Sequence, residues 1–277
     1  MPLAPMLAAN GARIPAIGFG TSGLGDVRAE HVAAALKAGY RHIDTARKYG
    51  TERIVGEGMR ASGVPRQDIF LCTKVSHENL HAADFARSLD DSLAALGVDY
   101  VDLLLVHWPE KNTPLAETMG ALATAKRQGL TRHIGVANFN IAMLDDAIRL
   151  CPEPLVTLQA ECHPYLDQTK VIAACRERGL VLTAYCPLAR GRLQGDPVLA
   201  DIARRVGKAF AQVALRWLIQ QEVIAAIPRS SNAQRIAQNI DVFDFELSEE
   251  DMRRIAALAR PDGRIGNPAG RAPVWDA

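Results

Sequence analysis

Cysteines are few in this sequence and follow no recognisable spacing. Five are scattered over 277 residues, and none belongs to a CxxC pair. An odd number without paired spacing argues against a disulfide framework, and the missing CxxC motif argues against a zinc site. We therefore expect reduced thiols in a cytoplasmic protein without a metal site.

Long apolar runs and an excess of charge of one sign are also missing. No stretch reaches the roughly 18 apolar residues of a membrane span, and the first residues, MPLAPMLAANGARIP, lack a basic region followed by an apolar one. The net charge of +1 comes without a long basic stripe, which gives no reason to expect nucleic acid as a partner. We expect neither a membrane nor a nucleic acid to be bound.

No low-complexity stretch and no Pro/Gly linker divides the chain, so we expect residues 1–277 to form a single domain. Short β-rich runs alternate eight times with longer amphipathic runs, at 27–39, 51–61, 84–96, 115–128, 140–149, 168–178, 198–220 and 232–240. The β-rich runs are almost continuously apolar, as in VDLLLV, which is typical of strands covered on both faces. Eight such units predict an α/β fold, the (β/α)8 TIM barrel.

Additional elements are predicted at both ends of the barrel sequence. Residues 5–15 predict a β-hairpin about Asn10-Gly11, the dipeptide that most favours a type I′ turn; this hairpin is a candidate lid. SEEDMRRIAALA opens with Ser248 as an N-cap and predicts one extra C-terminal helix. The closing GNPAGRAPVWDA is predicted to be an irregular tail and a candidate lining of the site.

Polar residues recur where the predicted strands end. Asp44 ends YRHID and is followed in the same loop by Tyr49, whereas Lys74 ends IFLCTK and His107 ends DLLLVH. Asn138, Gln159 and Tyr185 occupy the corresponding places of later strands. Each alone is readily explained as a solvated loop residue or a satisfied core histidine, but together they predict a catalytic face, because the carboxyl ends of barrel strands form the active site.

Four of these residues suggest acid catalysis. Lys74 follows an apolar run and needs a carboxylate partner, which Asp44 can supply. The Lys74 ammonium is expected to lower the pKa of the Tyr49 phenol. His107 can hydrogen-bond a substrate carbonyl oxygen, so Tyr49 and His107 together would stabilise a developing alkoxide.

A resemblance to a known family emerges from a longer set of motifs. GYRHIDTARKYGTE, LCTKV, LLLVHWP, IGVANF, LQAECHPY, AYCPLARG and IPRSSNAQRIAQNIDVFDFELSEED occur in order over nearly the whole chain. They resemble the aldo-keto reductase superfamily, and with NPAGRAPVWD they look closest to the bacterial 2,5-diketo-D-gluconate reductases. The resemblance implies a monomer that uses NADPH to reduce an aldehyde, a ketone or a small dicarbonyl or keto-sugar, such as 2,5-diketo-D-gluconate or methylglyoxal.

The resemblance also assigns roles to individual positions. It implies that Tyr49 donates the proton, that Lys74 and Asp44 tune it, and that His107 orients the carbonyl. The nicotinamide end of NADPH would be held by residues that follow the strands: Asn138, Gln159, Tyr185 and Leu188. The adenosine and its 2′-phosphate would be held by residues of IPRSSNAQRIAQN: Arg229, Ser230, Arg235, Gln238 and Asn239. Two guanidinium groups and a hydroxyl beside a helix start also form an anion site on physical grounds.

Several positions depart from the family pattern. Ala137 stands where many members carry a hydroxyl, Arg229 where Lys is frequent and Gln238 where Glu is frequent. The first loop, GFGTSGLGD, has no Trp, which leaves Trp108 as the apolar contact of the substrate. We therefore expect a roomier and more polar pocket.

Three competing interpretations remain at this point. Residues Gly18 to Gly23 satisfy GxGxxG, with Asp44 at the spacing of a ribose-binding acid, which would favour a Rossmann NAD dehydrogenase. Against it, the next helix is expected to begin after Asp26 as N-cap, so that Gly23 lies in a loop. The second interpretation is a cofactor-binding regulatory subunit, and the third is a barrel that uses Lys74 as a Schiff-base amine.

Overall fold

The computed structural model describes residues 4–23 and 26–276, and its main feature is a curled eight-stranded parallel sheet. The strands are β3 (Phe19–Gly20), β4 (His42–Asp44), β5 (Phe70–Val75), β6 (Val101–Val106), β7 (Thr131–Ala137), β8 (Leu155–Glu161), β9 (Val181–Tyr185) and β10 (Ile224–Ala226). Each strand pairs with the next along the chain. A parallel bridge between Ile17 and Ala226 joins the first strand region to the last, and the Gly18 amide donates to the Ala226 carbonyl at 2.8 Å. The arrangement is consistent with the predicted (β/α)8 fold.

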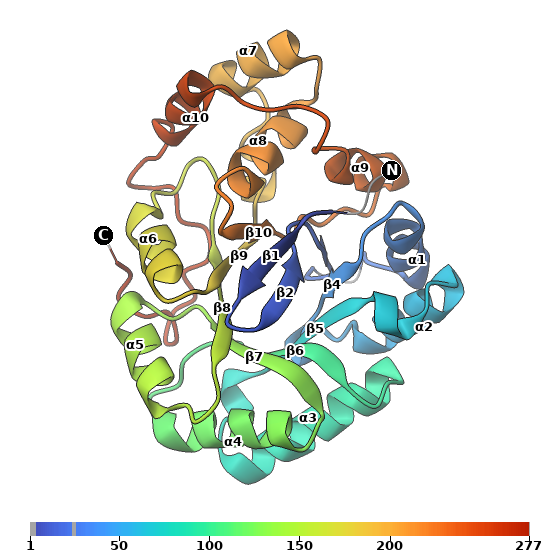
Figure 1. Cartoon of the computed structure of the whole chain (residues 1–277), viewed down its shortest axis with the longest axis vertical. Coiled ribbons are helices and arrows are strands. Elements are labelled where there is room, and N and C mark those ends of the chain that lie inside the picture. The colour runs from blue at the N-terminus through green and yellow to red at the C-terminus, as the bar shows by residue number, and fades with distance from the viewer. Residues whose placement is uncertain (1–3, 24–25, 277) are drawn as a thin grey trace.

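Helices surround the strands on the outside (Figure 1). They are α1 (Ala29–Lys37), α2 (Glu52–Ser62), α3 (Ala82–Leu96), α4 (Leu115–Arg127), α5 (Ile141–Leu150), α6 (Thr169–Glu177), α7 (Pro197–Val206), α8 (Phe210–Ile219), α9 (Ala233–Ile240) and α10 (Glu249–Ala256). The prediction of one helix over 198–220 is wrong. Gly207 adopts a left-handed conformation with φ of 68° and ends α7, so the chain turns before α8 begins.

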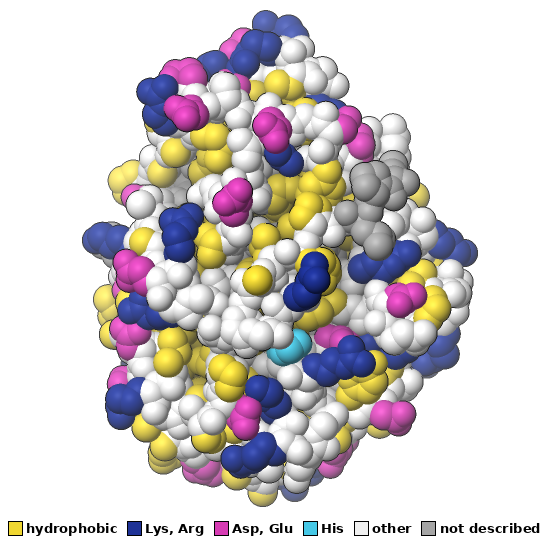
Figure 2. All heavy atoms as spheres, viewed as in Figure 1, with side chains coloured by type: hydrophobic (Ala, Val, Ile, Leu, Met, Phe, Trp, Pro, Cys, Tyr) yellow, Lys and Arg dark blue, Asp and Glu magenta, His cyan; other side chains and the backbone are white. Residues whose placement is uncertain are grey.

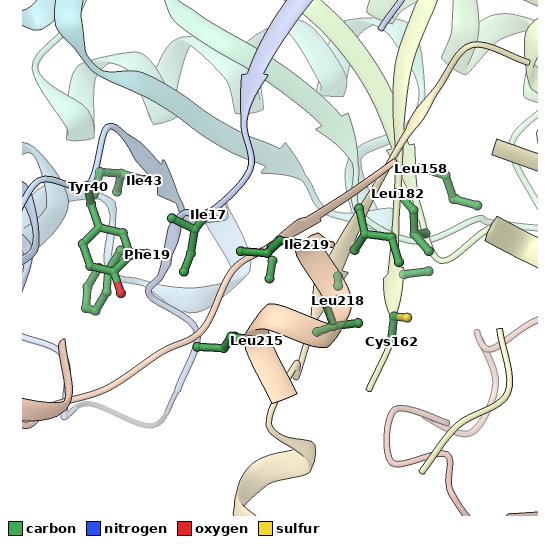
Figure 3. Packing of buried hydrophobic residues seen from close by; sticks show 14 of the residues in the cluster. Ile17, Phe19, Tyr40, Ile43, Leu158, Cys162, Leu182, Leu215, Leu218 and Ile219 are labelled. Atoms are coloured by element: carbon green, nitrogen blue, oxygen red, sulfur yellow. The ribbon is translucent and has the colours of Figure 1, made fainter. Parts of the chain in front are cut away.

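The alternation of side chains along the strands divides the buried apolar residues into two groups. The outer group fills the space between the strands and the helices. Figure 3 shows Ile219 of α8 between Ile17 and the strand residue Leu182, with Leu215 and Leu218 of the same helix below them. The inner group fills the amino-terminal half of the ring of strands and includes Cys72, Leu103, Leu105, Val156 and Val181. The sheet therefore encloses a packed interior at this level.

The predicted hairpin is confirmed as β1 (Met6–Ala9) and β2 (Ala12–Pro15), which pair antiparallel. Asn10 and Gly11 both have positive φ, 43° and 88°, as a type I′ turn requires. The Asn10 amide donates to the carbonyl of Leu155, the first residue of β8, at 2.8 Å. Figure 1 shows the hairpin across the middle of the ring of strands. It covers the amino-terminal end of the ring, opposite to the strand ends that carry the candidate site.

Two cap predictions have different outcomes. Ser248 caps α10 as predicted, because its hydroxyl oxygen accepts the Asp251 amide at 3.1 Å. Asp26 does not cap α1, which begins only after Arg28. The Asp26 carboxylate is instead ion-paired with the guanidinium of Arg229, which follows β10. A charged partner from the neighbouring loop has outcompeted the backbone amides of α1.

No helix in the described ranges is both long and apolar enough to cross a membrane. Within the same residues, no group of three or more His, Cys, Asp or Glu side chains is arranged to hold a metal ion. On the face that bears the hairpin, Lys and Arg side chains are interspersed with Asp and Glu (Figure 2).

Two helical glycines allow a matched test of the packing. A Cβ added at Gly56 of α2 would overlap the backbone carbonyl of Leu96 at the end of α3, whereas a Cβ at Gly120 of α4 would meet nothing within 4 Å. We predict that Gly56→Ala lowers the free energy of unfolding by about 1–3 kcal/mol through overpacking. Gly120→Ala should raise it by about 0.5–1 kcal/mol, because alanine is the better helix former. Urea unfolding of both variants checks this, and equal effects would contradict the close α2–α3 contact.

Candidate active site

A buried ion pair lies at the carboxyl ends of the first strands. Lys74 of β5 is 0% exposed, because the alternation along the strand turns it, like Cys72, into the ring. Its Nζ donates to Asp44 Oδ1 at 2.6 Å and to the Thr45 carbonyl at 2.7 Å. A buried ammonium is tolerated only with such partners. The predicted Lys74–Asp44 pair is therefore confirmed as a contact.

The Asp44 carboxylate extends this pair across the ring. Its second oxygen, Oδ2, accepts the side-chain amide of Gln159 from β8 at 2.8 Å. Burial is the largest single effect and would lower the pKa of Lys74, but the charges of Asp44, Tyr49 and Cys72 and the hydrogen bond to Asp44 together outweigh it and raise that pKa. Lys74 is thus a fixed cation, which removes the free amine that a Schiff-base mechanism requires.

Tyr49 reaches the pair from a short 3-10 helix, η1 (Arg47–Tyr49). The Lys74 Nζ lies 5.2 Å from the centroid of its ring. The Tyr49 and His107 rings meet edge to face, with centroids 5.4 Å apart. All four residues predicted to be catalytic are therefore gathered at one place.

The electrostatics of Tyr49 differ from the sequence prediction. Desolvation raises the pKa of its hydroxyl, whereas the charge of Lys74 and a hydrogen bond from it lower the pKa, and the balance lies at about 12. The expected lowering by Lys74 is present but smaller than the effect of burial. At neutral pH the hydroxyl is protonated and able to act as a proton donor.

His107 directly follows β6, and its pKa is well below the usual value. Burial is the main cause, and the positive charges of Lys74 and Arg271 add to it. The imidazole is therefore neutral at neutral pH. A neutral imidazole keeps one N–H, which can donate to an oxygen without supplying a full positive charge.

The residues expected at the nicotinamide form a connected group beside this cluster. Asn138, with φ of 63°, donates from its amide to the His107 carbonyl at 2.8 Å. Its Oδ1 accepts the Tyr185 hydroxyl at 2.8 Å. Leu188 lies in the next loop, where Cys186, Ala189 and Arg190 also have positive φ. Several non-glycine residues in this conformation indicate a backbone held in place by its surroundings.

The residues expected at the adenosine end lie between β10 and α9. Arg229 is ion-paired with Asp26, and the Ser230 hydroxyl accepts the Asn232 amide at 3.1 Å. Arg235 and Asn239 share one face of α9 because they are one helical turn apart. Arg235 and Gln238 are exposed, and Asn239 is buried.

Trp108, predicted to contact substrate, is packed against the C-terminal tail. The ring of Trp275 lies edge to face with it, with centroids 6.2 Å apart. The Arg271 guanidinium lies 5.7 Å from the Trp108 centroid, and that of Arg264 lies 3.9 Å from the Trp275 centroid. Sequence reasoning predicts the tail as a lining of the site but does not single out Trp275, Arg264 or Arg271. The motif NPAGRAPVWD contains Trp275 and Arg271 and is the sequence signal that could have identified these two residues.

The GxGxxG pattern does not form a dinucleotide loop. Gly20 belongs to β3, and Gly23 lies in a loop against the Arg229 guanidinium, well before α1 begins at Ala29. The third glycine therefore packs no helix on the sheet. The strand order, consecutive along the chain, also differs from the Rossmann order.

Comparisons with known proteins identify the family of this chain. The model of the aldo/keto reductase family matches residues 16–260. The methylglyoxal reductase DkgB of Escherichia coli O157:H7 is 42% identical over 267 residues, which are 95% of this chain and 99% of that protein. Mouse aldo-keto reductase family 1 member A1 is 38% identical, with 93% of this chain and 90% of that protein covered.

Solved structures match as well. A crystal structure of a protein provisionally named 2,5-diketo-D-gluconic acid reductase B superposes with a TM-score of 0.94 and 47% identity over 98% of each chain. The Bombyx mori aldo-keto reductase in complex with NADP gives a TM-score of 0.87 and 34% identity over 94% of each chain. Aldo-keto reductases are oxidoreductases that use NADP(H). This chain belongs to the aldo/keto reductase family.

Proposed function

We propose that the protein is a (β/α)8-barrel enzyme that uses NADPH to reduce the carbonyl of a small dicarbonyl or keto-sugar to an alcohol. The observation that carries the proposal is the cluster of a buried Lys74–Asp44 pair with Tyr49 and His107 at the carboxyl ends of the strands. The cluster offers a protonated phenol, a neutral imidazole and a fixed cation around one point. These are the groups that proton delivery to a developing alkoxide requires.

Tyr49 is the proton donor in this mechanism. Its pKa of about 12 keeps the hydroxyl protonated over the physiological range. As the carbonyl oxygen gains negative charge, it becomes a stronger base and takes the phenolic proton. The Lys74 ammonium beside the ring stabilises the phenolate that remains. Asp44 and Gln159 keep that ammonium in place.

His107 orients the carbonyl. Because its imidazole is neutral, its N–H can hydrogen-bond the carbonyl oxygen without competing with Tyr49 as the proton source. The edge-to-face contact of the two rings supports their acting on one oxygen. Trp108, next to His107, offers an apolar surface to the carbon part of the substrate.

The donor set of this chain fits NADPH. Asn138 and Gln159 each retain hydrogen-bonding capacity beyond the bonds described, which suits a carboxamide, and Tyr185 offers a ring for stacking. Arg235 and Ser230 at the start of α9 suit a 2′-phosphate. Arg229 would bind the same phosphate once its ion pair with Asp26 is broken. Leu188, Gln238 and Asn239 would contact the rest of the cofactor. NADPH, when bound, supplies the hydride that reduces the carbonyl carbon.

The proposed substrate class is supported by the names of the relatives. The DkgB proteins are named methylglyoxal reductases, and the structural match of 47% identity carries the name of a 2,5-diketo-D-gluconic acid reductase. Both names describe small polar carbonyl compounds. A first loop without Trp, GFGTSGLGD, is compatible with such substrates.

The proposed reaction is tested by the loss of absorbance at 340 nm, where reduced nicotinamide absorbs. We expect purified protein to oxidise NADPH in the presence of methylglyoxal or 2,5-diketo-D-gluconate, faster than NADH and faster than with bulky aromatic aldehydes. A preference for bulky aldehydes would overturn the substrate class. Tight NADPH binding without turnover of any carbonyl would favour a regulatory subunit instead.

Removal of the Tyr49 hydroxyl tests the proton donor. We predict that Tyr49→Phe lowers kcat by about 100- to 10,000-fold, the usual contribution of a general acid, and leaves the Kd for NADPH unchanged. Tyr100→Phe is the matched control, because Tyr100 packs with Arg66 and Arg132 away from the cluster. Stopped-flow or steady-state rates at 340 nm measure the effect. Turnover of Tyr49→Phe close to that of Tyr100→Phe would exclude Tyr49 from this role.

Removal of one guanidinium tests the phosphate site. We predict that Arg235→Gln raises the Kd for NADPH at least about tenfold, because a charge-assisted hydrogen bond is lost, and hardly changes the Kd for NADH. Arg53→Gln is the control, since Arg53 is an exposed arginine at the start of another helix, α2. Fluorescence titration measures both constants. Equal weakening of NADPH and NADH would argue that Arg235 does not contact the 2′-phosphate.

A further inference from the structure

The C-terminal tail, residues 257–276, is held tightly against the barrel along its first part. The Arg260 amide donates to the Tyr165 carbonyl at 3.2 Å, and the Arg260 guanidinium stacks 3.9 Å from the Tyr165 ring centroid. At Gly263 an added Cβ would overlap the Tyr165 carbonyl. The backbone of the tail therefore lies directly against the backbone carbonyl of Tyr165.

The next contact is made by a buried carboxylate. Glu161 is the last residue of β8 and is 0% exposed. Its Oε1 accepts the Ile265 amide at 2.7 Å, and its Oε2 accepts the Gly266 amide at 2.5 Å. The His163 Nε2 also lies 2.8 Å from Oε1. One strand-end carboxylate thus binds two successive backbone amides of a segment that is distant in the sequence.

The fit at this point leaves no room for a side chain. A Cβ at Gly266 would lie 2.8 Å from the Tyr185 hydroxyl and 2.9 Å from Glu161 Oε2. The Tyr185 hydroxyl is itself engaged with Asn138. An added methyl group would therefore displace the Tyr185 hydroxyl or the Glu161 carboxylate, so the tail segment is closely packed against the end of the barrel.

Beyond this point the tail is bonded to the barrel a second time, at the start of α5. The Asn140 amide donates to the Val274 carbonyl at 2.9 Å, and the Ile141 amide donates to Asp276 at 2.9 Å. Arg271, between the two attachments, and Trp275, within the second one, lie beside Trp108. The positive charge of Arg271 helps to lower the pKa of His107.

We propose that Glu161 is a positioning residue that latches the tail, and that this latch places Trp275 and Arg271 as one wall of the substrate pocket. The proposal rests on the proposed reductase function and assigns substrate affinity to a carboxylate that belongs to none of the catalytic contacts. Glu161 acts through the tail. Its loss should weaken the binding of the carbonyl substrate and leave the proton transfer intact.

The charge of Glu161 is what makes the latch strong. Burial alone would raise the pKa of its carboxyl, but hydrogen bonds from His163, Gly266 and Ile265 hold the pKa below the usual value. Hydrogen bonds that backbone amides donate to an ionised carboxylate are stronger than those donated to a neutral acceptor. If one oxygen is replaced by an NH2 group, a donor faces the Gly266 or Ile265 amide and one bond is lost.

Glu161→Gln tests the latch in the full-length protein. We expect KM for methylglyoxal to rise about tenfold, which is the effect of one lost charged hydrogen bond. We expect kcat and the Kd for NADPH each to stay within about twofold of the values of the unaltered protein, a free-energy change well below that of one hydrogen bond. Hydrogen exchange followed by mass spectrometry should accelerate in peptides that cover 264–276 and stay unchanged in β5 and β6. Glu110→Gln is the matched control, because Glu110 also accepts two backbone amides, those of Lys111 and Asn112, within its own loop.

Two further variants keep the test decisive. Gly266→Ala displaces the same segment from the tail side and should raise KM to a similar extent, even where Glu161→Gln folds poorly. In a Trp275→Ala background, Glu161→Gln should add little further rise in KM, because the wall that it positions is already lost. An unchanged KM with normal tail exchange, or fully additive effects of the two substitutions, would overturn the latch. Absence of any turnover by the unaltered protein would instead overturn the reductase function and leave the exchange result to judge the latch.

Discussion

The buried pair of Lys74 and Asp44 is the constraint on which the rest of the site depends. An ammonium with no exposure to water is stable only if the surrounding groups replace its hydration, and here a carboxylate oxygen and the Thr45 carbonyl do so within 2.7 Å. The second carboxylate oxygen binds Gln159 from the far side of the ring. The pair therefore fixes the relative positions of β4, β5 and β8, and every other candidate catalytic group is placed around it.

The same pair decides what Tyr49 can do. Burial favours the neutral phenol, and the nearby ammonium favours the phenolate, so the two effects oppose each other and the hydroxyl stays protonated. This balance suits a proton donor better than either extreme. In the proposed mechanism, the phenolate left after proton transfer would be a buried, unpaired anion if Lys74 were absent. Without burial, water would compete for the proton. The site thus combines a weak acid, the Tyr49 phenol, with a cation that stabilises its conjugate base.

Local sequence is sufficient to predict the repeated units, the hairpin and the four clustered residues, because each depends on neighbours along the chain. Apolar runs of strand length mark the strands, and a polar residue at the end of each run falls at the mouth of a barrel. The break at Gly207 escapes prediction because the flanking helices share an amphipathic pattern, and a single glycine can be tolerated within a helix. The Asp26 cap is wrong because Arg229, far away in the sequence, competes for the same carboxylate.

The contacts of the tail escape prediction for a different physical reason. Glu161 accepts hydrogen bonds from backbone amides, which every residue except proline carries, so the amino-acid sequence does not mark these donors. Only Gly266 is marked by its residue type, because a Cβ there would collide with Tyr185. This arrangement separates two tasks. The proposed proton donor and its partners stand at or after the ends of strands whose positions the buried pair fixes, whereas the proposed wall beside Trp108 is carried by a segment outside the barrel. Residues of the tail can therefore change the pocket without disturbing Lys74, Asp44 or Tyr49, provided that the backbone still reaches Glu161.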